Sequence, residues 1–227
     1  MREIHKLTNS FNNKGYVQFP MEQYFSELDK FYDDFLDIND AEWSFIIKNK
    51  FAPVDYYKNK HSKLEIEQER EKALQEYHQG NFCYSFRRIT DNQQRKSVSS
   101  FLAIKTFLDS TEFKSFLSEI TKKSINTLLL CYLSWFDLGD FLTTHCDSGS
   151  CINIVINFTK GWEHNHGGLT FILDKQKENI IEALVPTYLS TLIIDTGEKS
   201  IPHFVSMVSS VGVRGSKRMA VVARYDA

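Results

Sequence analysis

The pattern of hydrophobic and polar positions along the chain changes near residue 125. Before this point, apolar side chains recur at the spacing of helix faces; after it, they form short runs rich in β-branched and aromatic residues. The pattern predicts helices over residues 21–37, 62–79, 98–108 and 111–123, with one strand over 82–89. We therefore expect a helical first part and a strand-rich second part.

Two of the predicted helices differ in character. The helix over 21–37 is amphipathic, because its aromatic and leucine side chains recur at helical spacing: Tyr24, Phe25, Leu28, Phe31, Tyr32 and Phe35. The segment 62–79 is rich in strong helix formers and should be largely solvated. Gly80 follows it and is expected to end it in a left-handed conformation.

The second part reads as a series of short strands separated by turn sequences such as TKGW and NHGG. The predicted strands are residues 126–136, 150–158, 169–173, 179–185, 191–195, 203–208 and 218–225. Many short strands in succession indicate a β-sandwich or barrel. We expect residues 1–227 to form a single domain, with 1–125 a helical support region containing one strand and 126–227 the β core, and with the helices packed on one sheet.

Composition argues against some classes of protein and indicates a cellular compartment. The chain has 227 residues and 14% aromatic residues, enough to bury a sizeable core. A formal net charge of −2 argues against a nucleic-acid partner, and no apolar stretch is long enough for a membrane helix. The four cysteines form no C-x-x-C pair, and the first residues lack an apolar signal segment, so we expect reduced thiols and a cytoplasmic protein.

The segment 139–149 carries the clearest chemical pattern. His145 and Asp147 are two residues apart, and residues at this spacing in a strand point to the same face. An isolated H-x-D is common in surface turns, but here it lies between apolar runs, and His203 begins a later predicted strand. Two histidines and one carboxylate form the facial triad of non-haem Fe(II) oxygenases. We expect His145, Asp147 and His203 to bind iron.

A buried arginine is the next requirement of such a site. A co-substrate that carries a carboxylate into the core needs a cationic partner there, and the planar fork of arginine binds both carboxylate oxygens. Arg218 begins the last predicted strand, 15 residues after His203. We treat Arg214, Lys217 and Arg224 as solvated, but Arg214 becomes a rival of Arg218 if the inserted loop at residues 211–217 is helical.

Together these segments resemble the Fe(II)/2-oxoglutarate-dependent dioxygenases, and within them the prolyl-hydroxylase-like branch that includes small amino-acid hydroxylases and halogenases. The resemblance rests on GDFLTTHCD (139–147), INFTKGW with GGLTF (156–171), TLIID (191–195) and the run from His203 to RMAVVARY. It implies a mainly β fold with added helices, the double-stranded β-helix, a cupin-like jelly roll. It also implies Fe(2+) as the metal, with 2-oxoglutarate and O₂ as co-substrates.

The resemblance assigns further residues. Arg218 would hold 2-oxoglutarate, helped in many members by a tyrosine on the strand after the H-x-D. Asn157 occupies the corresponding place here and could donate a hydrogen bond instead, with Thr170 as a possible neighbour. Related halogenases have Gly or Ala in place of the carboxylate, so Asp147 implies hydroxylation.

The substrate is suggested by the segment 80–89, which resembles a strand beside the substrate pocket in small amino-acid hydroxylases and halogenases. Either Arg87 or Arg88 could pair with a substrate carboxylate, since adjacent strand residues face opposite ways, and Tyr84 could line the pocket. The alternative is an edge strand with solvated arginines.

Three functions compete at this point. The first is hydroxylation of an unactivated C–H bond in a free amino acid or similar small metabolite, which the compact chain favours. The second is hydroxylation of a prolyl or other side chain in a protein, and the third is a non-catalytic β-roll that binds a ligand. The sequence does not indicate an oligomeric state.

Overall fold

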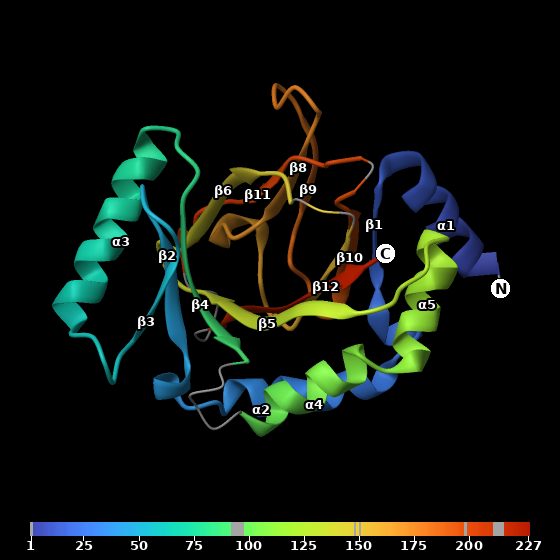
Figure 1. The fold of residues 1–227 in the computed structure, drawn as a ribbon, viewed down its shortest axis with the longest axis horizontal. Helices are drawn as coiled ribbons and strands as arrows, with labels where there is room; N and C mark the ends of the chain where they lie inside the picture. Colours follow the sequence, from blue (N-terminus) through green and yellow to red (C-terminus); the bar gives the residue numbers. More distant parts are fainter. Residues whose placement is uncertain (1, 92–97, 148, 150, 198, 211–215) are drawn as a thin grey trace.

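The computed structural model describes residues 2–91, 98–147, 149, 151–197, 199–210 and 216–227. Twelve strands form one curled sheet (Figure 1). They are β1 (Tyr16–Pro20), β2 (Ser44–Lys48), β3 (Val54–Tyr57), β4 (Tyr84–Thr90), β5 (Leu128–Phe136), β6 (Phe141–His145), β7 (Cys151–Asn157), β8 (Thr170–Leu173), β9 (Ile180–Leu184), β10 (Ser190–Asp195), β11 (His203–Val205) and β12 (Arg218–Asp226).

The strands of the second part form two facing layers. One layer has the order β10-β7-β12-β5 and the other β6-β11-β8-β9, and every pairing within them is antiparallel. β4 joins the layers, because it pairs with β5 through residues 87–90 and with β6 through residues 84–85. This arrangement is a double-stranded β-helix with added helices, which confirms the predicted fold class.

Helices cover the outer face of the β10-β7-β12-β5 layer (Figure 1). They are α1 (Arg2–Lys14), α2 (Phe31–Leu36), α4 (Ser99–Leu108) and α5 (Thr111–Thr121). Their apolar side chains pack in one core with alternate residues of the strands, such as Ile152, Ile154 and Ile156 of β7. The residues between these positions face the interior of the roll, because successive strand residues point to opposite sides.

α3 (Lys63–His78) lies on the other side of the molecule, beside β2 and β3 (Figure 1). Ile66 and Ala73 pack with Phe45, Cys83 and Phe141 in a smaller core, while most of the helix is exposed, as its composition predicts. Ser62 caps its first turn, accepting a hydrogen bond from the Glu65 amide at 3.2 Å. Gly80 follows with a φ of 76°, the predicted left-handed end.

The strands at the two ends of the sheet order meet through side chains. The hydroxyl of Tyr16, on β1, donates a hydrogen bond to Glu182, on β9, at 2.7 Å. Tyr16 also belongs to an apolar cluster with Ile172, Leu184 and Leu192. These contacts close the roll on the side away from β4.

The prediction of one strand within residues 1–125 is wrong, since β1, β2, β3 and β4 all lie there. β1 pairs with β10 of the core, and β2 pairs with both β3 and β4. The three missed strands are short, and their extended backbone is stabilised by partner strands that local periodicity does not reveal. The helix α1 was also not predicted.

The continuous helix predicted over 21–37 is also wrong in detail. The segment contains 3₁₀ turns at Met21–Gln23 and Ser26–Lys30, followed by the short α2. Phe25 interrupts the helical backbone with φ −138° and ψ 77°. Its ring packs against Phe107, Phe113 and Phe116, so tertiary packing overrides the helical periodicity.

The remaining predicted elements agree with the structure to within a few residues at their ends. All four cysteines are free. None of the helices in the described ranges combines the length and the apolar character that crossing a membrane requires.

Candidate metal site

His145, Asp147 and His203 meet between the two layers of the roll. One ligand atom from each of the three lies within 4.8 Å of the others. His145 is the last residue of β6 and His203 the first of β11, and the two are directly paired across these strands. Paired residues of neighbouring strands project to the same face, so the imidazoles lie side by side with ring centroids 4.3 Å apart.

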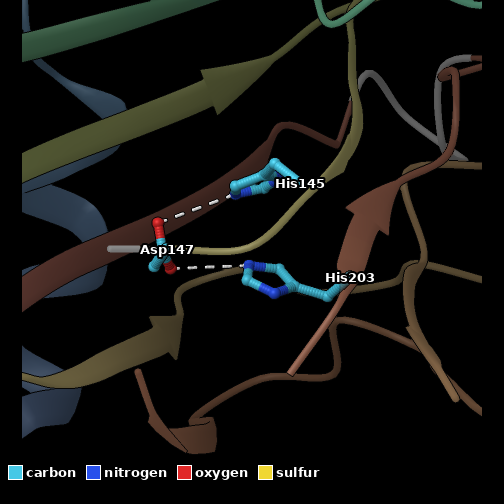
Figure 2. Close-up of side chains that lie close together, drawn as sticks. All are labelled: His145, Asp147 and His203. Carbon is cyan, nitrogen blue, oxygen red and sulfur yellow. Dashed lines mark ion pairs between the residues drawn. The ribbon is translucent and has the colours of Figure 1, made fainter. Parts of the chain in front are cut away.

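The carboxylate of Asp147 lies opposite the two rings (Figure 2). Its oxygens are 3.7 Å from Nε2 of His145 and 3.6 Å from Nε2 of His203. Asp147 itself follows the end of β6, so the turn after the strand, rather than strand geometry, presents its side chain. The structure therefore brings together the three residues predicted as metal ligands.

Both histidines are oriented as metal ligands require. Nδ1 of His145 lies 3.0 Å from the carbonyl oxygen of Thr143, and Nδ1 of His203 lies 2.9 Å from that of Ile201. A carbonyl oxygen accepts only, so each Nδ1 carries the proton and each Nε2 presents a lone pair. Burial, reinforced by the neighbouring His203, lowers the pKa of His145 to about 4 and keeps its ring neutral at neutral pH.

A cavity of about 90 Å³ adjoins these ligands. Its wall is largely apolar, with contributions from both layers and from β4: Phe86, Phe136, Leu142, Val155, Leu192, Ile194, Val205 and Val222. Several polar residues interrupt this surface, including Tyr132, Ser134 and Thr170. Thr170, at the start of β8, lines the cavity, and its proposed contact with the co-substrate stays a prediction.

Arg218 supplies a buried cation in the same cavity. It begins β12, is 2% exposed, and donates a hydrogen bond from Nε to the carbonyl of Gly168 at 3.1 Å. Its guanidinium lies 4.5 Å from the centroid of the Phe136 ring. Burial lowers its pKa to about 10, which still leaves it charged at neutral pH.

No described carboxylate pairs with Arg218, in contrast to the other arginines for which partners are seen. Arg70, Arg87, Arg88 and Arg224 each contact an aspartate. A buried charge without a counter-ion is costly, so this position favours an anionic ligand. Arg214, the predicted rival, lies outside the described residues.

Asn157 does not reach the cavity. It lies on the interior face of β7, but at the strand's end, where its amide nitrogen donates to the carbonyl and hydroxyl oxygens of Ser190 at 3.0 and 3.1 Å. Tyr132, on β5, is the tyrosine that lines the cavity, and burial raises its pKa. The same alternation that directs Arg218 inward along β12 applies to residues 132, 134 and 136 of β5, and could have identified Tyr132.

Arg87 and Arg88 do face opposite ways, and each is partly buried and paired with aspartates of the fold. Arg87 contacts Asp40 and Asp137 and stacks on the Trp135 ring at 4.1 Å. Arg88 engages both oxygens of Asp55. Aspartates far away in the sequence thus bind both guanidinium groups. The strand pattern could not predict these partners.

Two further residues are less exposed than the sequence suggested. Arg224 is partly buried: it lines the cavity, and its Nη2 lies 2.8 Å from Oδ1 of Asp147. Lys217 is half-buried, with its ammonium 4.4 Å from the centroid of the Trp135 ring. Tyr84 lies beside the cavity, its ring centroid 5.6 Å from that of Phe86.

Known proteins resemble this chain in fold but not detectably in sequence. No family model matches the sequence, and no curated protein is significantly similar to it. The fold is similar to that of a 2OG-Fe(II) oxygenase family oxidoreductase from Burkholderia pseudomallei, with a TM-score of 0.62, 12% identity, and coverage of 98% of this chain and 90% of that one.

Two prolyl hydroxylases are similar to a comparable degree. The prolyl-4-hydroxylase of Pseudomonas putida gives a TM-score of 0.62 at 10% identity, covering 98% of each chain. The Trichoplax adhaerens prolyl hydroxylase, solved with a peptide of hypoxia inducible factor, gives 0.59 at 11%, covering 99% of this chain and 90% of that one. The protein therefore has the double-stranded β-helix fold of the 2OG-Fe(II) oxygenases.

Proposed function

We propose that the protein is an Fe(II)- and 2-oxoglutarate-dependent oxygenase that hydroxylates an unactivated C–H bond. The observation that carries the proposal is the position of Arg218, a buried cation without a described carboxylate partner, in the cavity that also contains the His145, Asp147 and His203 ligand atoms. The site thus combines a metal-ligand set with a receptor for an anion.

The donor set fits Fe(II). Two neutral imidazoles and one carboxylate on one side of a metal leave its other positions open, as in non-haem Fe(II) oxygenases. Fe(II) in this site, with 2-oxoglutarate, would supply the activation of O₂ for hydroxylation, with succinate and CO₂ as the other products. The remaining contributions come from the chain's own side chains.

Arg218 would bind the carboxylate of 2-oxoglutarate that does not reach the metal. Its Nε is already fixed by the Gly168 carbonyl, so its two terminal nitrogens are the ones directed to a ligand. The hydroxyls of Tyr132 and Thr170 lie in the same cavity wall and can donate further hydrogen bonds. The apolar side chains around them exclude water, which strengthens each of these contacts.

For the substrate, we propose a free amino acid or a similar small metabolite. The enclosed position of the metal-ligand residues, in a cavity with a largely apolar wall between the two layers, supports a compact substrate. Tyr84, beside the cavity, remains a candidate for contact with it. A prolyl or other side chain of a protein is the alternative, since two similar structures are prolyl hydroxylases, one of them in complex with a peptide.

The four free cysteines support a reducing compartment, and we propose the cytoplasm. The non-catalytic alternative gains no support, because the metal-ligand set and the buried Arg218 share one cavity.

The test is an assay of the purified protein with Fe(II), 2-oxoglutarate and O₂. Succinate formation would be followed, and products would be weighed by mass spectrometry, with a panel of free amino acids and a panel of proline-containing peptides. We expect a mass gain of one oxygen in a small-molecule product; the same gain in a peptide alone would overturn the substrate proposal.

The ligand variants are the controls for this assay. His145→Ala, Asp147→Ala and His203→Ala should each abolish Fe(II)-dependent succinate formation while retaining the circular dichroism spectrum of the folded protein. Full activity in any one variant would remove that residue from the metal site, and absence of succinate formation in the wild type with every candidate substrate would contradict the proposed activity.

A further inference from the structure

Asp147 differs from the two histidine ligands in how the chain holds it. His145 and His203 lie in strands that pair with each other, and each ring is oriented by a backbone carbonyl two residues before it. Asp147 lies beyond the end of β6. Strand pairing therefore does not determine the direction of its carboxylate, and side-chain contacts have to do so.

Two side chains from the opposite layer hold this carboxylate. Arg224 donates from Nη2 to Oδ1 of Asp147 at 2.8 Å, and Asn153 donates from Nδ2 to Oδ2. Nε of Arg224 also donates to Oδ1 of Asn153 at 2.9 Å. The three side chains form a closed ring of hydrogen bonds in which both carboxylate oxygens are engaged.

Two of the three side chains in this ring of hydrogen bonds come from paired strands. Arg224, on β12, and Asn153, on β7, are directly opposite each other in the antiparallel register of these strands. Both residues line the cavity, and Asn153 is 6% exposed, so solvent competes little for the hydrogen bonds that Asn153 makes. The β12–β7 pair can therefore fix a carboxylate that the turn after β6 leaves free to rotate.

We propose that Arg224 and Asn153 are positioning residues that hold the Asp147 carboxylate in its metal-binding orientation. The proposal rests on the metal centre proposed above and concerns how that centre is preorganised. Each carboxylate oxygen accepts one hydrogen bond and keeps a second lone pair, so one of them remains free to bind the metal. Side chains that orient metal ligands typically contribute ten- to a hundredfold in metal affinity.

The charge of Arg224 affects metal binding separately from its hydrogen bonds. A guanidinium near a divalent ion also repels it, so replacing arginine by a neutral residue would combine two opposing effects. Arg224→Lys keeps the charge but loses the planar fork that bonds Asp147 and Asn153 together. Asn153→Leu removes the amide bonds from a neutral residue of similar size, and therefore leaves the charge unchanged.

The first measurement is Co(II) affinity of the full chain, by titration of the visible absorption of the bound ion. We expect Asn153→Leu and Arg224→Lys each to weaken Co(II) binding about tenfold or more and to change the absorption spectrum, because the carboxylate is no longer held. The matched control is Arg88→Lys, since Arg88 also engages an aspartate and is exposed to a similar degree, 24% against 26%. Its Co(II) affinity should equal that of the wild type.

Wild-type affinity and spectrum in both Asn153→Leu and Arg224→Lys would overturn the proposal. A loss of affinity as large in Arg88→Lys would also overturn it, because the effect would then reflect general loosening of the roll. Failure of the wild type itself to bind Co(II) is a different result: it would contradict the metal centre and hence the proposed function.

A second measurement compares one variant with and without formate, so its result does not depend on how the substitution changes the stability of the protein. In Asp147→Gly, the donors of Arg224 and Asn153 lose their acceptor and lie beside the position the carboxylate left. Added formate should restore Co(II) affinity about tenfold in Asp147→Gly, and should have no such effect in the double variant Asp147→Gly/Asn153→Leu. Equal rescue in the two variants, or none in either, would mean that the donors do not place a carboxylate at the metal.

Discussion

At the scale of single residues, the arginines of the chain differ in which side chains they contact. The guanidinium of Arg88 has both oxygens of Asp55 as its partners, whereas that of Arg218, among the residues the structure describes, contacts a backbone carbonyl and an aromatic ring and no carboxylate. The fold thus supplies a carboxylate partner to Arg88, whereas we propose that a bound ligand supplies one to Arg218. The difference follows from their neighbours, because the side chains themselves are identical.

Because no described carboxylate pairs with Arg218, we can predict how its replacement affects binding of the co-substrate. Arg218→Met should weaken 2-oxoglutarate binding by tens- to thousandsfold, because losing a charge-assisted pair with a buried carboxylate is worth about 2–5 kcal/mol. Metal affinity should change far less, since Arg218 contacts none of the ligands. Titration of 2-oxoglutarate into Co(II)-loaded protein measures the first effect, and Co(II) titration alone measures the second.

Arg88→Met serves as the comparison, because its partner Asp55 is not a metal ligand and its fork is occupied within the fold. Its 2-oxoglutarate affinity should stay close to that of the wild type. If both variants lose affinity to the same extent, Arg218 is not the specific anchor.

At the scale of elements, the turn at Gly167-Gly168 connects the cavity wall to β8. Gly167 has φ 71° and ψ −157°, and a Cβ atom there would lie 2.1 Å from the Met207 carbonyl oxygen. Its own carbonyl accepts a hydrogen bond from Trp162 at 2.9 Å, and the next carbonyl holds Arg218. The turn therefore holds Arg218, the side chain that we propose binds 2-oxoglutarate.

A single methyl group should disturb this turn. We expect Gly167→Ala to lower the free energy of unfolding by more than about 2 kcal/mol, since backbone strain and a steric clash with main chain both oppose it. Urea denaturation would measure the loss, and 2-oxoglutarate titration should show weaker binding because Arg218 moves with the turn.

Gly80→Ala is the control for a positive φ without a steric contact. Gly80 has a similar φ of 76°, but nothing lies within 4 Å of a Cβ atom placed there. Its loss should be about 1 kcal/mol, the typical cost of a left-handed non-glycine residue. Equal losses at both glycines would show that the contact with Met207 does not matter.

At the scale of the whole molecule, the proposed ligands would link the two layers of the roll. The histidines belong to β6 and β11 in one layer, and Arg218 belongs to β12 in the other. A metal ion with 2-oxoglutarate bound to it would contact both, and binding to the folded state alone raises its stability.

Melting temperature should therefore report occupancy of the site. Co(II) and 2-oxoglutarate, each at about a hundred times its dissociation constant, stabilise the folded state by roughly 2.7 kcal/mol apiece. Each should raise the melting temperature by about 5–10 °C for a chain of this size, and removal of the metal with EDTA should reverse the gain. His145→Ala should show no shift with Co(II); an equal shift in that variant would place the metal elsewhere.

Much of this protein follows from its sequence alone, because strand alternation and helix periodicity are local. The runs from residue 126 to 225 predicted the strands of both layers, the H-x-D predicted two of the three residues that meet at the candidate metal site, and the start of the last strand predicted the inward-facing Arg218. The strands and the inward direction of Arg218 need only the alternation of neighbouring residues and the order of strands along the chain, whereas Asp147 is presented by the turn after β6.

What only the tertiary structure decided are the partners of residues far apart in sequence. β1 is a strand because it pairs with β10, and the 21–37 segment breaks its helix where Phe25 packs against α5 and its neighbours. Asn157 turned out to bond Ser190, and Arg224 turned out to hold Asp147, 77 positions away. A sequence pattern states which way a side chain points on its own element, whereas the atom it meets there is set by the packing of the whole chain.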